Sequence, residues 1–456
     1  MPGVSRDLER SLTAEVSEER LASAVAHLAQ WARLAGSDAE MEAAQWVCGQ
    51  LVAFGLDARI LEHDAYVSLP GEATLTTIAP RQGDIPCITP AFAAPTPAGG
   101  VEGDVVDLGR QAPGGQDVRG KIVLLDGLPT PWVAQELSVL GALGLIHICP
   151  GTRRYEMIAS PVWGSPSHLS RQALPRTHIA SINTPDGEAL RAVASAGRLR
   201  VRIRAAVDTR WRRTPIVLGE IRGGEDPARF LLLAGHLDSW HRGAMDNAAA
   251  NACMLEISRL LAQHRRQLRR SVRVAFWSGH SQGRYSGSAW YADEAWEDLD
   301  RNCAMHLNIE SPGGIDATVI DGKGHREAMT LAAAVAKEYT GQAIAGGRIG
   351  KIGDESFWPI GIPSIHLSSY QSADAGGLNP SATVVGKPKG KANGYGWWWH
   401  TPEDTPDKVD PRHLARDCRM YVALAVRVCT ARVLPLDYVA AGEEFVAILE
   451  DLDRKA

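Results

Sequence analysis

The sequence lacks the features that mark several classes of protein. It has no apolar run near the roughly 18 residues that a membrane-spanning helix needs, so no membrane partner is predicted. Forty-eight basic and 53 acidic side chains leave a net charge of −5, which does not favour a nucleic-acid partner. The first ten residues carry charges where a secretory signal has its apolar core. These absences predict a cytoplasmic protein.

Cysteine is scarce and scattered. The chain has 7 cysteines and no Cys-x-x-Cys pair. An odd, dispersed set argues against a disulfide framework and against a thiolate zinc site. Any metal site must therefore be built from imidazoles and carboxylates.

The composition and the pattern of expected strands and helices change twice along the chain, which predicts three segments. Residues 1–87 and 206–456 form two parts of one α/β domain with a mostly parallel sheet flanked by helices, because strands and helices alternate regularly after about residue 206. Residues 88–205 are richer in proline and glycine and predict a small, inserted β-rich domain. The alternative is that 88–205 is an ordinary βαβ segment of the main fold.

One stretch carries the clearest chemical signal. The apolar run Leu232-Leu233-Ala234-Gly235 reads as a buried strand that ends in His236-Leu237-Asp238, and a glycine loop then leads to Asp246 at the start of a helix. The edge of an α/β sheet at its strand ends is where such folds place their ligands. We therefore predict that this stretch is the active centre.

Two more candidates follow later strands. Glu310 ends the strand at 303–309, and His400 follows three tryptophans. With His236 and Asp246 they form a donor set that suits zinc, or else manganese or cobalt. Asp238 is placed to hold the other nitrogen of the His236 ring. Each histidine taken alone is as well explained by a structural role, so the prediction depends on their meeting at one sheet edge.

The order of these motifs resembles the di-zinc aminopeptidase family, which includes bacterial leucyl aminopeptidases, glutamate carboxypeptidase and the glutaminyl cyclases. The motifs are His236-x-Asp238, Asp246-Asn247, Phe276-Trp277-Ser278, Leu307-Asn308-Ile309-Glu310, Gly353-Asp354, Gly361-Ile362-Pro363 and His400-Thr401-Pro402-Glu403-Asp404-Thr405. The resemblance implies one metal held by His236, Asp246 and Glu310, where the family has Asp. It implies a second metal held by Asp246, a Glu and His400. In the insert, 118–124 and 141–146 resemble the protease-associated domain.

The sequence departs from the family at the catalytic pair. Where the family has Glu-Glu, as general base and metal ligand, this chain has His280-Ser281. A serine hydroxyl is a poor zinc ligand, so the second site is predicted to be weak, absent or rebuilt with His280, and the chain binds one or two metals. We predict that His280 is a ligand or the base. The alternative is a structural loop histidine.

Three residues are candidates for contact with substrate. Arg284 offers a bidentate donor for a carboxylate, and Tyr285 offers a donor for an oxyanion. Trp399 is a candidate wall of an aromatic pocket. Simple packing explains each of them as well. Glu355 is a candidate for the missing base, although a carboxylate at the start of a helix is an equally ordinary role.

Two functions remain open. The first is a divergent metal-dependent hydrolase that cleaves a C–N bond of a small-molecule or short peptide-like substrate with a metal-activated water. The second is an inactive family member that acts as a ligand-binding or scaffold protein. The convergent donors favour the first, and the missing Glu-Glu pair favours the second. The sequence also leaves a homo-oligomer open.

Overall fold

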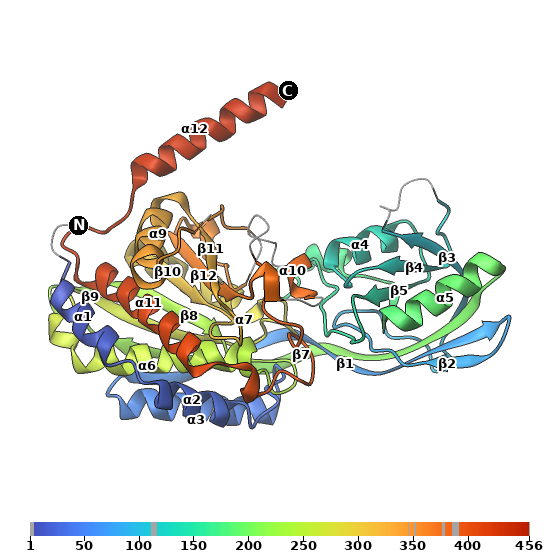
Figure 1. Cartoon of the computed structure of the whole chain (residues 1–456), viewed down its shortest axis with the longest axis horizontal. Helices are drawn as coiled ribbons and strands as arrows, with labels where there is room; N and C mark the ends of the chain where they lie inside the picture. Colours follow the sequence, from blue (N-terminus) through green and yellow to red (C-terminus); the bar gives the residue numbers. More distant parts are fainter. Residues whose placement is uncertain are drawn as a thin grey trace.

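The computed structural model describes residues 4–110, 116–344, 346–350, 353–375, 379–384 and 392–455. The chain forms two lobes, joined by a long antiparallel ribbon of β1 (Asp57–Ala79) and β7 (Arg200–Ile221) (Figure 1). β7 pairs along nearly the whole length of β1, and a register shift between Pro70 and Ala73 absorbs the irregular backbone there.

The larger lobe contains the predicted mostly parallel sheet. Its parallel core is formed by β12 (Ser364–Tyr370), β10 (Cys303–Ile309), β8 (Asp226–His236) and β9 (Arg270–Trp277), in that order. The antiparallel β11 (Val319–Gly324) lies outside β12, and β7 lies antiparallel beside β9. The run 231–234 in β8 is fully buried, as expected for a parallel strand covered on both faces.

Helices cover both faces of this sheet. One face packs on a large core to which α1 (Arg6–Ala14), α2 (Glu18–Leu28), α3 (Asp38–Ala53), α6 (Ala249–Gln263), α9 (Arg326–Thr340) and α11 (Pro411–Thr430) contribute. The other face packs on α7 (Ser286–Glu294) and α8 (Trp296–Asn302). Side-chain caps set two helix starts: Ser37 accepts from the Glu40 N–H and Asp410 from the Arg412 N–H.

The smaller lobe contains most of the predicted insert, 88–205, together with β2 and the far end of β1, and has its own core. Its parallel strands are β3 (Val101–Gly109), β4 (Ile122–Asp126), β5 (Gly144–Cys149) and β6 (His178–Asn183). The short β2 (Gly83–Ile85) pairs with β1, and two helices, α4 (Pro131–Val139) and α5 (Thr184–Ala196), complete the lobe. The likeness of this lobe to a protease-associated domain stays a prediction.

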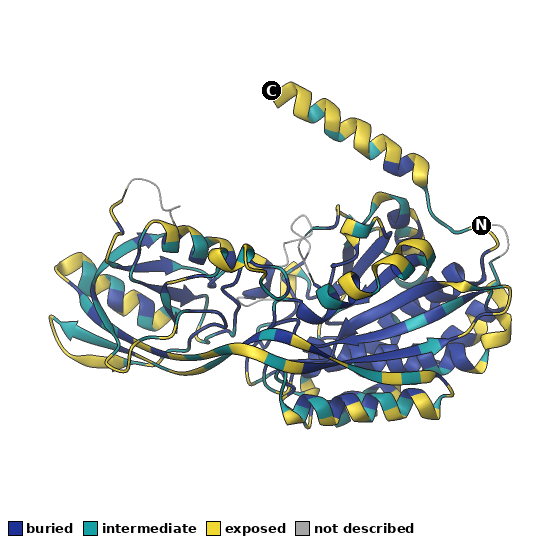
Figure 2. Ribbon diagram, turned by 180° about the vertical axis from the view of Figure 1, so that it is seen from behind, coloured by how far each residue is buried: buried dark blue, intermediate teal, exposed yellow. Residues whose placement is uncertain are grey.

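The last helix packs on α9 of the larger lobe through its first half. α12 (Tyr438–Lys455) projects from the body of the molecule and is largely exposed (Figure 2). Among the described residues, no helix is both apolar enough and long enough to cross a membrane.

Candidate metal centre

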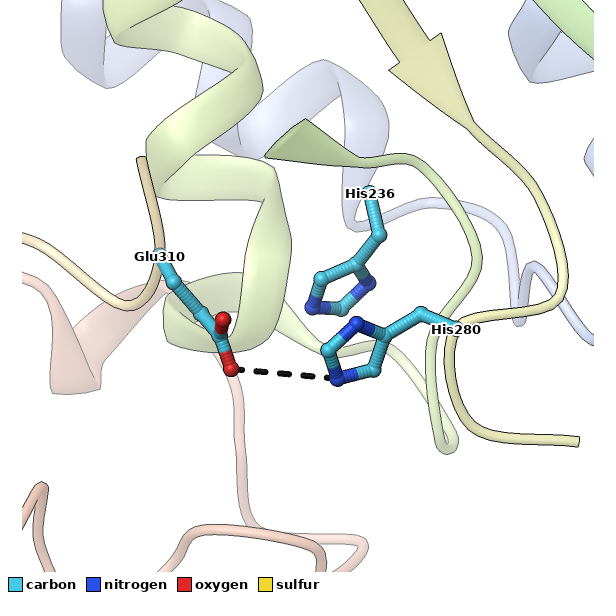
Figure 3. A group of neighbouring side chains, drawn as sticks. All are labelled: His236, His280 and Glu310. Atoms are coloured by element: carbon cyan, nitrogen blue, oxygen red, sulfur yellow. Dashed lines mark ion pairs between the residues drawn. The ribbon is translucent and has the colours of Figure 1, made fainter. Parts of the chain in front are cut away.

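The predicted donors meet at one edge of the sheet. His236 is the last residue of β8, His280 lies in the loop after β9, and Glu310 directly follows β10. Because these neighbouring strands are parallel, their carboxyl ends bring the three side chains together. One ligand atom from each lies within 4.8 Å of the others, and the side chains point toward one another (Figure 3). The sequence predicted that the donors meet at one sheet edge, but it assigned His280 to a second site with Asp246 and His400, whereas the structure groups His280 with His236 and Glu310.

Asp246 lies between two histidines. Its Oδ1 is 3.2 Å from Nε2 of His236, and its Oδ2 is 3.2 Å from Nε2 of His400. The turn at 244–248 has a non-helical backbone at Asp246. The Asp404 carboxylate accepts the N–H groups of Met245 and Asp246 at 2.8 and 3.0 Å, which holds this turn in place. The two carboxylate oxygens of Asp246 therefore face two different imidazoles.

Asp238 orients the centre in a way the sequence did not predict. The Nδ1 of His236 donates to the backbone carbonyl of Asp238 at 2.8 Å, while the Asp238 carboxylate is 3.8 Å away. That carboxylate instead accepts the backbone N–H groups of His280 and Ser281 at 3.0 and 3.1 Å. Asp238 thus fixes the His236 ring with its main chain and the His280 loop with its side chain.

His280 is oriented toward the other donors. Its Nδ1 donates to Asp354 at 2.8 Å, and Asp354 also accepts from Ser288 at 2.8 Å. This contact directs Nε2 toward Glu310, whose Oε1 is 3.7 Å away. The His280 ring stacks on the His236 ring at 3.8 Å. An imidazole whose Nδ1 is held by a carboxylate is the usual support for a metal ligand. The structure groups His280 with His236 and Glu310.

His400 is held by the smaller lobe. Its Nδ1 donates to the backbone carbonyl of Glu156 at 2.6 Å, and Trp399 stacks on its ring at 3.5 Å. Because Glu156 belongs to the segment between β5 and β6, the insert helps to set the position of one candidate ligand.

The charges of the site fit a cation. Nε2 of His236 is buried and lies 3.2 Å from Oδ1 of Asp246, but it makes no hydrogen bond of good geometry among the described residues. Although burial lowers the pKa of an imidazole, contact with Asp246 and the nearby negative charges raise the pKa of His236 to about 10. Burial raises the pKa of Asp404 to about 7. This excess of buried negative charge, together with an imidazole nitrogen left open, suits a divalent metal.

Sequence reasoning missed some of the supporting residues. Asp354 stood in a recognised motif but was not assigned to the site. His366, inside β12, has its Nδ1 3.9 Å from Glu310 and 2.9 Å from the Asn308 amide. The sequence signal that could have identified His366 was a histidine inside an apolar strand. Glu355 does not fit the role of base, because its buried carboxylate faces His306, with 3.5 Å between Oε2 and Nδ1.

A pocket of about 290 Å³ opens beside the donors. Its wall includes His280, Glu310 and His400, and all three predicted substrate contacts, Arg284, Tyr285 and Trp399, also line it. The smaller lobe contributes Thr130, Pro131, Trp132, Met157 and Ile158. The insert therefore shapes the space in which a ligand would lie.

Comparison with known proteins points to one family. Residues 217–425 match the model of peptidase family M28. A probable glutamate carboxypeptidase of Zea mays is 24% identical over 89% of this chain and 66% of its own length. Carboxypeptidase Q of Mus musculus is 26% identical over 57% of this chain and 58% of its own length. The chain thus spans just under two thirds of the maize relative.

Solved structures share the fold. An aminopeptidase from Aneurinibacillus superposes with a TM-score of 0.68 at 20% identity, covering 93% of this chain and 96% of the other. A zinc aminopeptidase from Bacillus subtilis gives 0.69 at 18% identity, covering 92% and 98%. At this level of identity the superpositions establish the architecture, which is the predicted zinc aminopeptidase-like fold.

Proposed function

The chain belongs to peptidase family M28, and from this premise we propose that it is a hydrolase that cleaves the C–N bond of a small amide or peptide-like substrate. The family supports a metal-dependent hydrolase. The observation that carries the finer proposal is the convergence of His236, His280 and Glu310 within 4.8 Å beside a 290 Å³ pocket. A pocket of this size accommodates a small substrate rather than a folded protein.

The donors support one well-built metal site. His236, His280, Glu310 and the Oδ1 side of Asp246 would hold the first ion, with zinc as the expected metal and manganese or cobalt as alternatives. On the second side His400 and Oδ2 of Asp246 face each other, and among the described residues no third donor completes a cluster with them. We therefore expect one tightly bound ion per chain. When bound, such an ion lowers the pKa of water and polarises a carbonyl oxygen.

The remaining residues orient and enclose the substrate. The Tyr285 hydroxyl accepts from Nη1 of Arg284 at 2.9 Å, which leaves its own proton available to a developing oxyanion. The Tyr285 ring lies 4.9 Å from the His280 ring, so this donor is close to the metal candidates. Trp399 and the smaller lobe close the pocket against water.

A second function is supported by the missing acid pair. With His280-Ser281 in place of two carboxylates, a chain that binds a metal and a ligand without hydrolysis is the alternative. The two functions differ in turnover, not in binding. Assays must therefore measure both.

The test is metal analysis combined with a substrate panel. We expect one zinc per purified chain, and hydrolysis of at least one aminoacyl anilide or small amide that is lost with a chelator and restored by zinc. His280→Ala is expected to bind zinc more weakly and to lose turnover. Metal binding without turnover on any substrate would favour the binding protein, and absence of bound metal and of metal-restored activity would refute the hydrolase.

A further inference from the structure

A second pocket lies behind one wall of the metal pocket. It has a volume of about 330 Å³ and is formed between the smaller lobe, the helices α7 and α8, and the segment that follows Asp354. Among the described residues, none lines both pockets. They adjoin where the Trp163 ring, which lines the second pocket, lies 4.2 Å from the Tyr285 ring, which lines the metal pocket. The second pocket is therefore a separate space.

Three tryptophans from separate parts of the chain line this space, which we call the tryptophan pocket. Trp163 comes from the segment between β5 and β6, Trp296 begins α8, and Trp358 begins the short 3₁₀ helix Trp358–Ile360. Trp296 is 45% exposed and Trp358 is 41% exposed. Single exposed apolar side chains are common on protein surfaces, but large ones gathered around one hollow are typical of a binding site. The convergence of these indoles points to a ligand.

The tryptophan pocket is formed in advance of any ligand. Ala289 and Ala292 lie one turn apart on α7, and their small side chains leave room between the indoles. Nε1 of Trp163 donates to Oγ of Ser356 at 2.9 Å, which fixes the orientation of this ring. A cavity whose walls are already ordered binds a ligand with a smaller loss of entropy.

The charge of the tryptophan pocket is negative. Asp293, one turn along α7 from Ala289, lines it, and the Asp293 carboxylate makes no ion pair or hydrogen bond with another described residue. Glu355 also lines it, although its carboxylate faces His306. Among the described lining residues there is no lysine, arginine or histidine. The protein supplies no cation of its own here, so a cationic ligand fits.

The walls favour one kind of cation. The face of an indole attracts a cation that lies within about 6 Å of the ring centroid. A primary ammonium has three N–H donors, and each needs an acceptor once water is removed. An indole N–H only donates, and Oγ of Ser356 already accepts from Trp163 and lies 2.9 Å from Oγ of Ser288. A methylated ammonium has few or no N–H donors, so aromatic walls and one carboxylate are enough for it.

We propose that the tryptophan pocket is a second binding site, separate from the metal centre, for a ligand that carries a methylated ammonium group. The indoles of Trp163, Trp296 and Trp358 contact the methyl groups, and Asp293 supplies the opposite charge. This site does not depend on the proposed hydrolysis, because it shares no described lining residue with the metal pocket. A free quaternary amine and a methylated lysine side chain both have this chemistry.

Ligand-observed NMR titration of the wild-type protein tests the preference for this group. The probes are choline, its neutral carbon isostere with a tert-butyl group in place of trimethylammonium, and ethanolamine. Choline is expected to bind about tenfold more tightly than either, because the isostere lacks the charge and ethanolamine keeps its N–H donors. Absence of saturable choline binding, or equal affinity for the isostere, would overturn the cation site. Equal affinity for ethanolamine would overturn the methylated group.

Paired variants locate the bound choline. Asp293→Asn and Glu310→Gln make the same change at an acid of each pocket, and affinity is expected to fall about fivefold in the first and to stay within about twofold in the second. A loss confined to Glu310→Gln would place choline in the metal pocket and refute the proposal.

A second pair of variants tests the aromatic walls. Trp358→Leu is expected to weaken choline about tenfold. Trp211→Leu is the control, at a tryptophan of β7 that is 56% exposed and lies outside the tryptophan pocket, and it is expected to leave the affinity unchanged. Because both tryptophans are largely exposed, neither change removes much core packing. Equal choline affinity in the two variants would refute the role of the indoles.

The source of the methylated group is identified by a peptide probe. A short peptide with trimethyllysine that binds about tenfold more tightly than choline would assign the site to a modified protein chain. Equal or weaker binding of the peptide would assign it to a free small molecule.

Discussion

Two buried histidines, one in each lobe, have pKa values that are shifted in opposite directions. His236 lies among Asp246, Asp238 and Glu310, and their charges raise its pKa to about 10 against the effect of burial. His147, on β5 of the smaller lobe, contacts the Gly127 carbonyl at 3.3 Å, and burial lowers its pKa to about 4. Burial alone keeps an imidazole neutral, whereas burial with several carboxylates prepares a site for positive charge. Environment, not residue type, separates a structural histidine from a candidate metal ligand.

The largest effect should come from removing the better placed imidazole. His236→Ala is expected to abolish zinc binding and to lower kcat/KM by on the order of 10³-fold, because the ion that activates water is lost. His147→Leu, at the buried histidine of β5, serves as the control and is expected to retain activity at neutral pH. Metal content and kcat/KM are measured on both. Similar losses of metal content and kcat/KM in the two variants would contradict the distinction between the two histidines.

The next largest effect is expected on zinc affinity, when the contact between Asp354 and Nδ1 of His280 is weakened. Asp354→Asn keeps the shape but weakens the charge-assisted contact with Nδ1, so zinc affinity is expected to fall by about tenfold to a hundredfold. Glu355→Gln, one position further and facing His306, is expected to change zinc affinity less than twofold. Competition titration with a zinc chelator measures both. An unchanged affinity in Asp354→Asn would show that His280 does not bind the metal.

His147 predicts a dependence of stability on pH. Because burial lowers its folded-state pKa to about 4, below the ordinary 6.5, the unfolded chain binds the extra proton as pH falls below 6.5. Stability is therefore lost between pH 6.5 and 4, by about 2 kcal/mol at pH 5 relative to pH 7.5. Urea unfolding at both pH values should show this loss in the wild type relative to His147→Leu. Parallel pH profiles would contradict it.

The smallest effect is expected at the contact between the lobes. Arg153 pairs with Glu403 at 3.2 Å and lies 3.8 Å over the Trp397 ring, but both members of the pair are exposed by more than a third. Arg153→Met is expected to change the free energy of unfolding by less than about 1 kcal/mol, since exposed pairs contribute little. Thermal unfolding measures this. A much larger change would mean that the insert depends on this contact for its position.

Much of the fold and the candidate site could be predicted from the sequence. Strand ends marked His236 and Glu310, and a parallel sheet necessarily gathers such ends at one edge. The role of the Asp238 carboxylate could not be predicted, because it contacts backbone N–H groups of a loop more than forty residues away. The support of His400 by Glu156 was equally hidden, since it depends on how the insert lies against the larger lobe.

The central claim is that His280 joins His236 and Glu310 around one metal. X-ray absorption at the zinc edge, on protein loaded with one equivalent of zinc, tests it most directly because the signal counts imidazole ligands. The account predicts two imidazoles per zinc in the wild type and one fewer in His280→Ala. An identical spectrum in the two proteins, at full zinc occupancy, would contradict it.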